Sequence, residues 1–190
     1  MRVRAMCVLS CLTAFAVSGQ QPVDTAAARA AFLLGKAAVQ AHRVEEGVRE
    51  MERAVALDGA NWEYHMWLGH AYVRQIGVVN FLKKPLVGRR MGAQYNKAVE
   101  LAPANVEAAE ARLDFYLEAP GIVGGGLDKA EAESRRIATL NPYRGAFAAA
   151  RIAEHEKQWA RADSVYRALV LEYPDSSRAA KALERLSRRQ

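Results

Sequence analysis

A pattern of small and aromatic residues that closes on a Pro or a Gly occurs four times along this chain of 190 residues. The clearest copy runs from residue 146 to residue 174, with the spacing expected of two helices that cross. It is carried by Ala149, Ala150, Ala153, Ala162, Tyr166, Leu169 and Pro174. Such a recurrence predicts stacked helical hairpins, because each hairpin buries its apolar face against its neighbours.

The four copies span residues 28–61, 62–105, 106–142 and 143–176, and an amphipathic segment at 177–190 follows them. Small residues at the expected helix crossings are Gly35, Gly69, Ala130 and Ala162; large ones between hairpins are Met51, Tyr95 and Tyr166; closing prolines are Pro103, Pro142 and Pro174. The pattern resembles the tetratricopeptide repeat, a helical hairpin of about 34 residues. This resemblance implies an all-α fold, a right-handed α-solenoid of about four such hairpins with 177–190 as a capping helix.

The second and third copies are longer than the pattern requires. We expect the extra residues to form a long turn within 75–90 in the second copy and a glycine-rich turn within 119–126 in the third. Turns within hairpins fall on one edge of such a stack, so we expect these two to pack on each other. The expected contacts join Val78, Val79, Phe81 and Leu82 to Ile122 and Val123. The string Ala-Pro-Gly-Ile-Val-Gly-Gly-Gly at 119–126 also resembles a loop in a group of exported bacterial tetratricopeptide proteins.

Residues 1–19 have the features of a signal peptide. Arg2 and Arg4 precede an apolar run at 5–17, and small residues offer cleavage after Ala16 or Gly19. The alternatives are an uncleaved anchor and a lipoprotein acylated at the second of two leader cysteines, Cys7 and Cys11. The sequence therefore predicts an exported protein, periplasmic or secreted, whose mature form has no cysteine for a disulfide or a thiolate site.

The remaining composition excludes several classes of function. A formal net charge of +6, part of it in the leader, is not that of a dedicated nucleic-acid binder. The four histidines lack the spacing of a zinc protease, and no Gly-x-Ser-x-Gly motif is present, so we expect neither an enzyme nor a bound cofactor or metal. The Gly124–Gly126 stretch suggests a small-ligand site, although Leu127 and Asp128 stand where a phosphate-binding loop requires Lys and Ser or Thr.

The resemblance also implies a concave groove lined by the first helix of each hairpin. The positions matched to this groove, together with two on the edge of the long turns, are Phe32, Lys36, Met66, His70, Glu110, Asp114, Glu118, Phe147, Arg151, Phe81 and Ile122. The third hairpin contributes several carboxylates, flanked by hairpins that contribute bases. This arrangement suggests a groove for a basic peptide with apolar anchors on Phe32, Met66 and Phe147. The alternative is that neighbouring bases neutralise the carboxylates.

These features predict a non-enzymatic protein–protein interaction scaffold or assembly factor in the bacterial cell envelope. It would bind a peptide or helix in the groove or on the edge of the long turns. The segment from Trp159 to Ala182 leaves a more specialised role open, that of a coordinator of outer-membrane or cell-wall assembly. A basic cluster within the second hairpin is the one candidate for contact with anionic lipid, or with another protein. It comprises Lys83, Lys84, Arg89 and Arg90.

Overall fold

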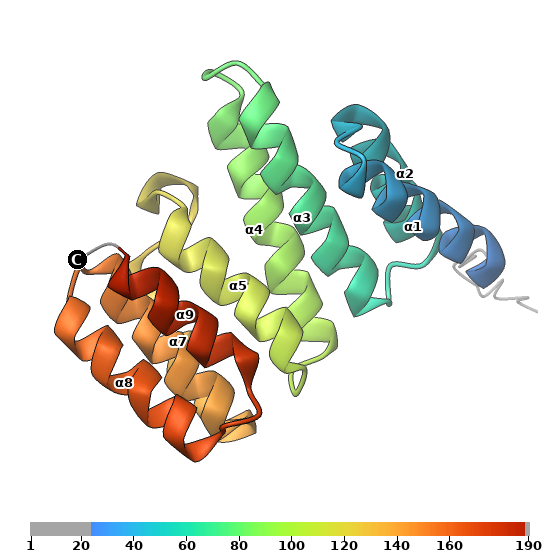
Figure 1. The fold of residues 1–190 in the computed structure, drawn as a ribbon. Helices are drawn as coiled ribbons and strands as arrows, with labels where there is room; N and C mark the ends of the chain where they lie inside the picture. Colours follow the sequence, from blue (N-terminus) through green and yellow to red (C-terminus); the bar gives the residue numbers. More distant parts are fainter. Residues whose placement is uncertain (1–23, 189–190) are drawn as a thin grey trace, which may run out of the picture.

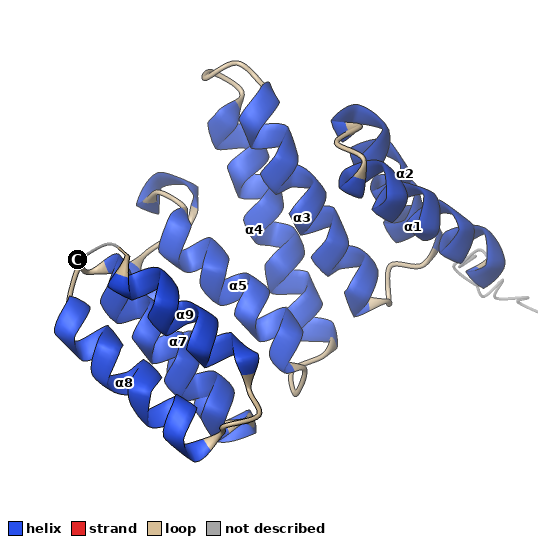
Figure 2. Cartoon of the chain, in the orientation of Figure 1, coloured by secondary structure: helices blue, strands red, loops and turns tan. Residues whose placement is uncertain are grey.

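The computed structural model describes residues 24–188, and the predicted signal peptide lies outside this range. The described chain is entirely helical, with nine α-helices, one short 3-10 helix and no strand (Figures 1 and 2). The helices are α1 (Thr25–Gln40), α2 (Val44–Leu57), α3 (Trp62–Val78), α4 (Lys84–Leu101), α5 (Val106–Glu118), η1 (Gly121–Val123), α6 (Leu127–Leu140), α7 (Pro142–His155), α8 (Trp159–Glu172) and α9 (Ser177–Ser187).

The helices pair as antiparallel hairpins, α1 with α2, α3 with α4, α5 with α6 and α7 with α8. The hairpins stack in chain order, and α9 packs on α8 at the C-terminal end (Figure 1). The predicted fold class, an α-solenoid of four hairpins with a capping helix, is confirmed. No helix of the described residues is long and apolar enough to cross a membrane.

The first helix of every hairpin begins with the same device. Asp24, Asn61, Asn105 and Asn141 precede α1, α3, α5 and α7, and each side chain accepts a hydrogen bond from a backbone N–H of the first turn. Such caps satisfy donors that have no partner within the helix, at about 1 kcal/mol each. These capping residues fix where the first helix of each hairpin begins.

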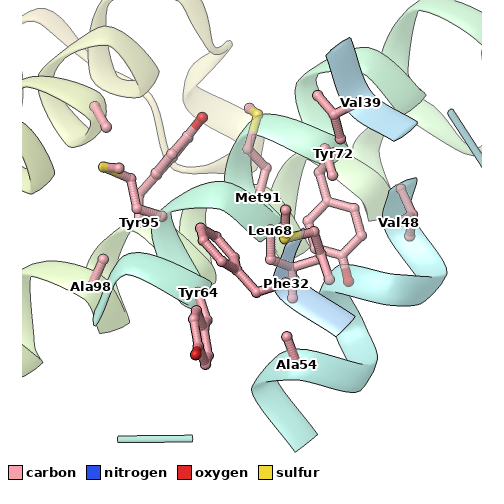
Figure 3. Packing of buried hydrophobic residues seen from close by; sticks show 14 of the residues in the cluster. Phe32, Val39, Val48, Ala54, Tyr64, Leu68, Tyr72, Met91, Tyr95 and Ala98 are labelled. Atoms are coloured by element: carbon pink, nitrogen blue, oxygen red, sulfur yellow. The ribbon is translucent and has the colours of Figure 1, made fainter. Parts of the chain in front are cut away.

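Small residues allow the helices to approach closely, as the repeat pattern predicts. A Cβ atom at Gly69 would lie 2.5 Å from the Tyr95 ring, which is itself buried. Gly35 in α1 faces Met51 in the same way. Figure 3 shows the resulting core, in which Leu68 and Tyr95 lie among apolar side chains from the first two hairpins.

The prediction of a long turn in the second hairpin is wrong. Most of the extra residues extend the two helices, so that α3 has 17 residues and α4 has 18, and the connection is only 79–83. Ile76 and Val79 pack against the core and hold the end of α3 in place. Pro85 fits the first turn of α4, where its missing N–H would have no helical partner.

The expected packing of the two turns on each other is wrong, and Val123 packs on α4 instead. Val123 lies beside Gly88 of α4, at 3.3 Å from where a Cβ would stand, so the third hairpin's turn rests on the side of α4. Phe81, Leu82 and Ile122 do not pack on one another; their exposed fractions are 75%, 73% and 74%. The reason is the extension of α3 and α4, which carries their connection beyond the neighbouring turn (Figure 1).

Candidate functional site

An apolar cleft of about 530 Å³ lies between the second and third hairpins. One wall comes from α3 and the other from α5, the floor is α4, and the turn around η1 closes one end. The lining residues are His70, Val73, Ile76, Lys84, Pro85, Gly88, Met91, Tyr95, Ala111, Asp114, Phe115, Glu118, Ala119, Pro120, Ile122 and Val123. This set is called the cleft below. Its volume is within the range of ligand-binding pockets.

Two glycines on α4 shape the floor. Gly88 and Gly92 are four residues apart, so they lie on one face of the helix. Val123 rests on Gly88, and the Phe115 ring rests on Gly92 with one ring carbon 2.8 Å from where a Cβ would stand. Larger residues at these positions would push the third hairpin away from α4, so the glycines set the depth of the cleft.

A polar pair joins the α3 wall of the cleft to its floor. The Tyr95 hydroxyl and His70 Nδ1 are 3.0 Å apart. Burial raises the pKa of Tyr95, and the nearby Asp114 carboxylate adds to this effect, so the hydroxyl keeps its proton and donates. Burial lowers the pKa of His70, which keeps the imidazole neutral and able to accept. This pair therefore offers hydrogen-bonding groups but no positive charge at neutral pH.

The buried histidine predicts a pH dependence of stability. His70 binds its proton less readily in the folded state than in the unfolded chain, so the free energy of unfolding should fall as pH drops below about 6.5. His70→Gln keeps an acceptor for Tyr95 and removes the titration. We expect its urea-unfolding free energy to fall less than that of the natural protein between about pH 7.5 and pH 5.5. His155→Gln, at an exposed position, is the control; equal pH slopes for the natural protein and His70→Gln would contradict the prediction.

Arginines neutralise most of the predicted acidic groove. Glu110 accepts hydrogen bonds from Arg144 of α7 at 2.6 Å and from Arg178 of α9 at 3.0 Å. Asp114 is paired with Arg151 of α7, whose charge counteracts the rise that burial causes in the pKa of Asp114. The alternative from the sequence is thus the correct one for these two residues, because α7 and α9 place bases across the concave face from α5.

Glu118 differs from Glu110 and Asp114. Its side chain is exposed, and it forms no ion pair within residues 24–188. It lies at the C-terminal end of α5, where it borders the cleft and also a smaller, more polar hollow lined by Arg151 and Glu154. A basic group on a ligand in the cleft would find its partner here.

The three predicted apolar anchors are wrong, because their side chains form part of the core. Phe32, Met66 and Phe147 are 7%, 1% and 5% exposed. The guanidinium of Arg178 covers the Phe147 ring at 4.2 Å from its centroid. Lys36, the remaining groove residue of the first hairpin, lies over the Trp67 ring at 4.5 Å.

The cleft brings together part of the predicted site. It contains His70, Asp114, Glu118 and Ile122, whereas Phe81 lies outside it on the α3–α4 connection. Residues that the sequence analysis missed supply most of the apolar lining: Val73, Ile76, Met91, Ala111 and Phe115. A signal for two of them existed in the sequence, since Val73 and Ile76 are apolar residues three apart on one helix, α3.

The glycine-rich loop does not offer an anion site. The N–H groups of Gly124, Gly125 and Gly126 donate to the carbonyls of Gly121, Pro120 and Tyr116, at 3.0, 3.3 and 2.8 Å. No backbone donor of the three glycines is left for a phosphate, so the small-ligand alternative loses its basis. Residues 24–188 also contain no group of three or more His, Cys, Asp or Glu side chains placed to hold a metal ion.

No protein-family model matches the sequence, and no curated protein matches it either. Solved structures match the fold. TTC0263, a thermophilic TPR protein from Thermus thermophilus, has a TM-score of 0.66 at 18% identity, over 82% of this chain and 81% of that one. Pseudomonas aeruginosa pilF has a TM-score of 0.62 at 16% identity, over 85% of this chain and 68% of that one. MamA of AMB-1 has a TM-score of 0.53 at 17% identity, over 85% of this chain and 81% of that one. At these identities the likeness is one of fold: the described chain has the fold of the tetratricopeptide-repeat solenoids.

Proposed function

We propose that this protein is a non-enzymatic interaction scaffold that binds a segment of another protein in the cleft. It acts in the bacterial cell envelope, an assignment that rests on the signal peptide predicted at 1–19. The bound segment presents apolar side chains to the floor and a basic residue to Glu118. The cleft is the single observation that carries this function.

The apolar lining supports a peptide as the ligand. Val73 and Ile122 stand exposed at the rim, and Met91 and Phe115 lie beneath them. Burial of such groups on binding contributes about 25 cal/mol per Å² of apolar surface. A few anchors in a desolvated centre supply most of the affinity at protein interfaces.

The charges at the cleft support a basic residue in that peptide. Glu118 is a cleft carboxylate of α5 that forms no ion pair within residues 24–188, and Lys84 stands on the side formed by α4. A ligand that runs past Glu118 with a Lys or Arg would form an ion pair there. Such a contact fixes the direction of the bound segment more than it adds affinity.

Site-specific crosslinking in cells tests this function. A photoreactive residue at Ile122 should give a discrete adduct with a partner protein, whereas the same residue at Leu171 of α8 should not. Leu171 is the matched control because its side chain is also highly exposed, but away from the cleft. Val73→Asp, added to the Ile122 probe, should lower the adduct yield at least tenfold by placing a charge on the apolar rim.

Charge reversal tests the basic character of the ligand. Glu118→Lys should weaken the same adduct, and Glu184→Lys on α9, also an exposed glutamate, should leave it unchanged. An adduct that survives Val73→Asp would contradict binding in the cleft. Equal effects of Glu118→Lys and Glu184→Lys would contradict the pairing with Glu118.

A further inference from the structure

Most of the α3–α4 hairpin lacks acidic residues. No Asp or Glu occurs between Glu63 and Glu100. Six basic residues lie in this interval: Arg74, Lys83, Lys84, Arg89, Arg90 and Lys97. Of these, Lys97 alone forms an ion pair within residues 24–188, with Glu100. The hairpin therefore carries a concentrated positive charge that the described part of the chain leaves mostly unneutralised.

Large apolar side chains are exposed at the end of the same hairpin. They are Val78, Phe81, Leu82 and Leu86, each more than half exposed. Residues 78–86, called the tip below, project beyond the turns of the neighbouring hairpins (Figure 1). Apolar groups gathered in one exposed place mark an interaction surface.

We infer that the tip docks on the surface of an anionic phospholipid bilayer. Phe81 and Leu82 enter the boundary between headgroups and acyl chains, and Lys83, Lys84 and Arg89 face the lipid phosphates. Segments that bind in this boundary of a membrane typically combine exposed Phe and Leu with neighbouring Lys and Arg. Anionic lipids attract basic residues near the surface, while an acidic residue would be repelled, and the hairpin has none in this interval.

The shape of the tip favours lipid over a protein partner. Apolar anchors at protein interfaces sit near the centre of a broad, well-packed patch of about 800 Å² on each side. The tip is instead a narrow projection whose neighbours fall away from it (Figure 1). A fluid bilayer closes around such a projection without a preformed pocket. This inference does not depend on what the cleft binds.

Vesicle flotation tests the inference. The protein is expressed from the full-length sequence and used as it is purified from the cells. We expect binding to vesicles of phosphatidylglycerol and phosphatidylcholine that exceeds binding to phosphatidylcholine alone. Phe81→Ser with Leu82→Ser should lower the partition coefficient at least tenfold. Lys83→Gln with Arg89→Gln should lower it about twenty-five-fold, at about fivefold for each charge.

Matched variants separate this site from general electrostatics and from the cleft. Arg161→Gln with Lys181→Gln removes the same net charge from exposed positions on α8 and α9 and should leave partitioning almost unchanged. Val73→Asn, which makes the rim of the cleft polar without adding a charge to the hairpin, should also leave it almost unchanged. Absence of preference for anionic vesicles, or equal losses in the two charge variants, would overturn the inference. Partitioning that survives the Phe81 and Leu82 changes would overturn the insertion of the tip.

Discussion

Gly145→Ala is expected to lower the free energy of unfolding by about 2 kcal/mol, although Ala is the better helix former. Gly145 lies in the first turn of α7, where the helix crosses the end of α6. A Cβ atom there would lie 2.6 Å from the backbone nitrogen of Ala138 and closer still to its Cα and Cβ. Because backbone blocks the space, the methyl group fits only if α6 and α7 move apart.

Two opposing effects decide the sign. Replacing Gly by Ala inside a helix gains up to about 1 kcal/mol in the absence of contacts. Forcing a methyl group into a packed site costs about 1–3 kcal/mol, and more when the neighbour cannot move. The separation would also weaken the hydrogen bond that Ser134 Oγ donates to the Gly145 carbonyl at 3.3 Å. The cost of packing therefore exceeds the gain in helix propensity.

Gly77→Ala is the matched control for this substitution. Gly77 also lies in a helix, α3, but a Cβ there would meet nothing within 4 Å. We expect this variant to gain about 0.5–1 kcal/mol, so the same chemical change has opposite signs at the two sites. Urea unfolding followed by far-ultraviolet circular dichroism measures both. Stabilisation by both variants would contradict the close crossing of α6 and α7.

The fold was predictable because its determinants are local and repeat. The approach of α3 to α4 requires a small residue at Gly69 and a large one at Tyr95, and the first hairpin has an equivalent pair in Gly35 and Met51. A single match to the pattern is weak evidence for a fold. Hairpins that stack on one another need small and large residues at equivalent positions, so the matches in several hairpins support one another. The sequence therefore predicted the stack and its capping helix.

The cleft was not predictable in the same way. The cleft lies beside α3 and α4, which are longer than the helices of the usual repeat. The repeat pattern shows that the second copy has extra residues, but it does not show whether these residues form helix or turn. The pairing of charges is equally hidden. Glu110 meets Arg178, which lies 68 residues away in the sequence, because α9 returns to the concave face. Spacing along one helix identifies the residues on its face, but not the residues that meet them from another helix.

Glu133→Gln is expected to lower the free energy of unfolding by about 2–3 kcal/mol. The Glu133 carboxylate lies on α6 and is only 4% exposed. It accepts hydrogen bonds from Arg112 of α5 at 2.5 Å and from Arg136 at 2.6 Å, and Arg136 also donates to the carbonyl of Pro103. Loss of the negative charge leaves two arginines without a counterion between α5 and α6. The cost stays below that of a fully buried pair because both arginines retain some contact with water.

The same substitution two residues earlier is the control. Glu131 pairs with Arg135 at 3.7 Å and its side chain is 46% exposed, so Glu131→Gln should change the free energy of unfolding by less than about 0.5 kcal/mol. Arg112→Leu combined with Glu133→Leu should recover part of the stability that Glu133→Gln loses, since the more buried arginine is then removed and only Arg136, which still donates to the Pro103 carbonyl, is left without its carboxylate. Because α5 carries one wall of the cleft, the Glu133 variant should also weaken the crosslink from Ile122, whereas Glu131→Gln should not. Equal effects of the two glutamine variants would show that Glu133 does not hold α5 against α6.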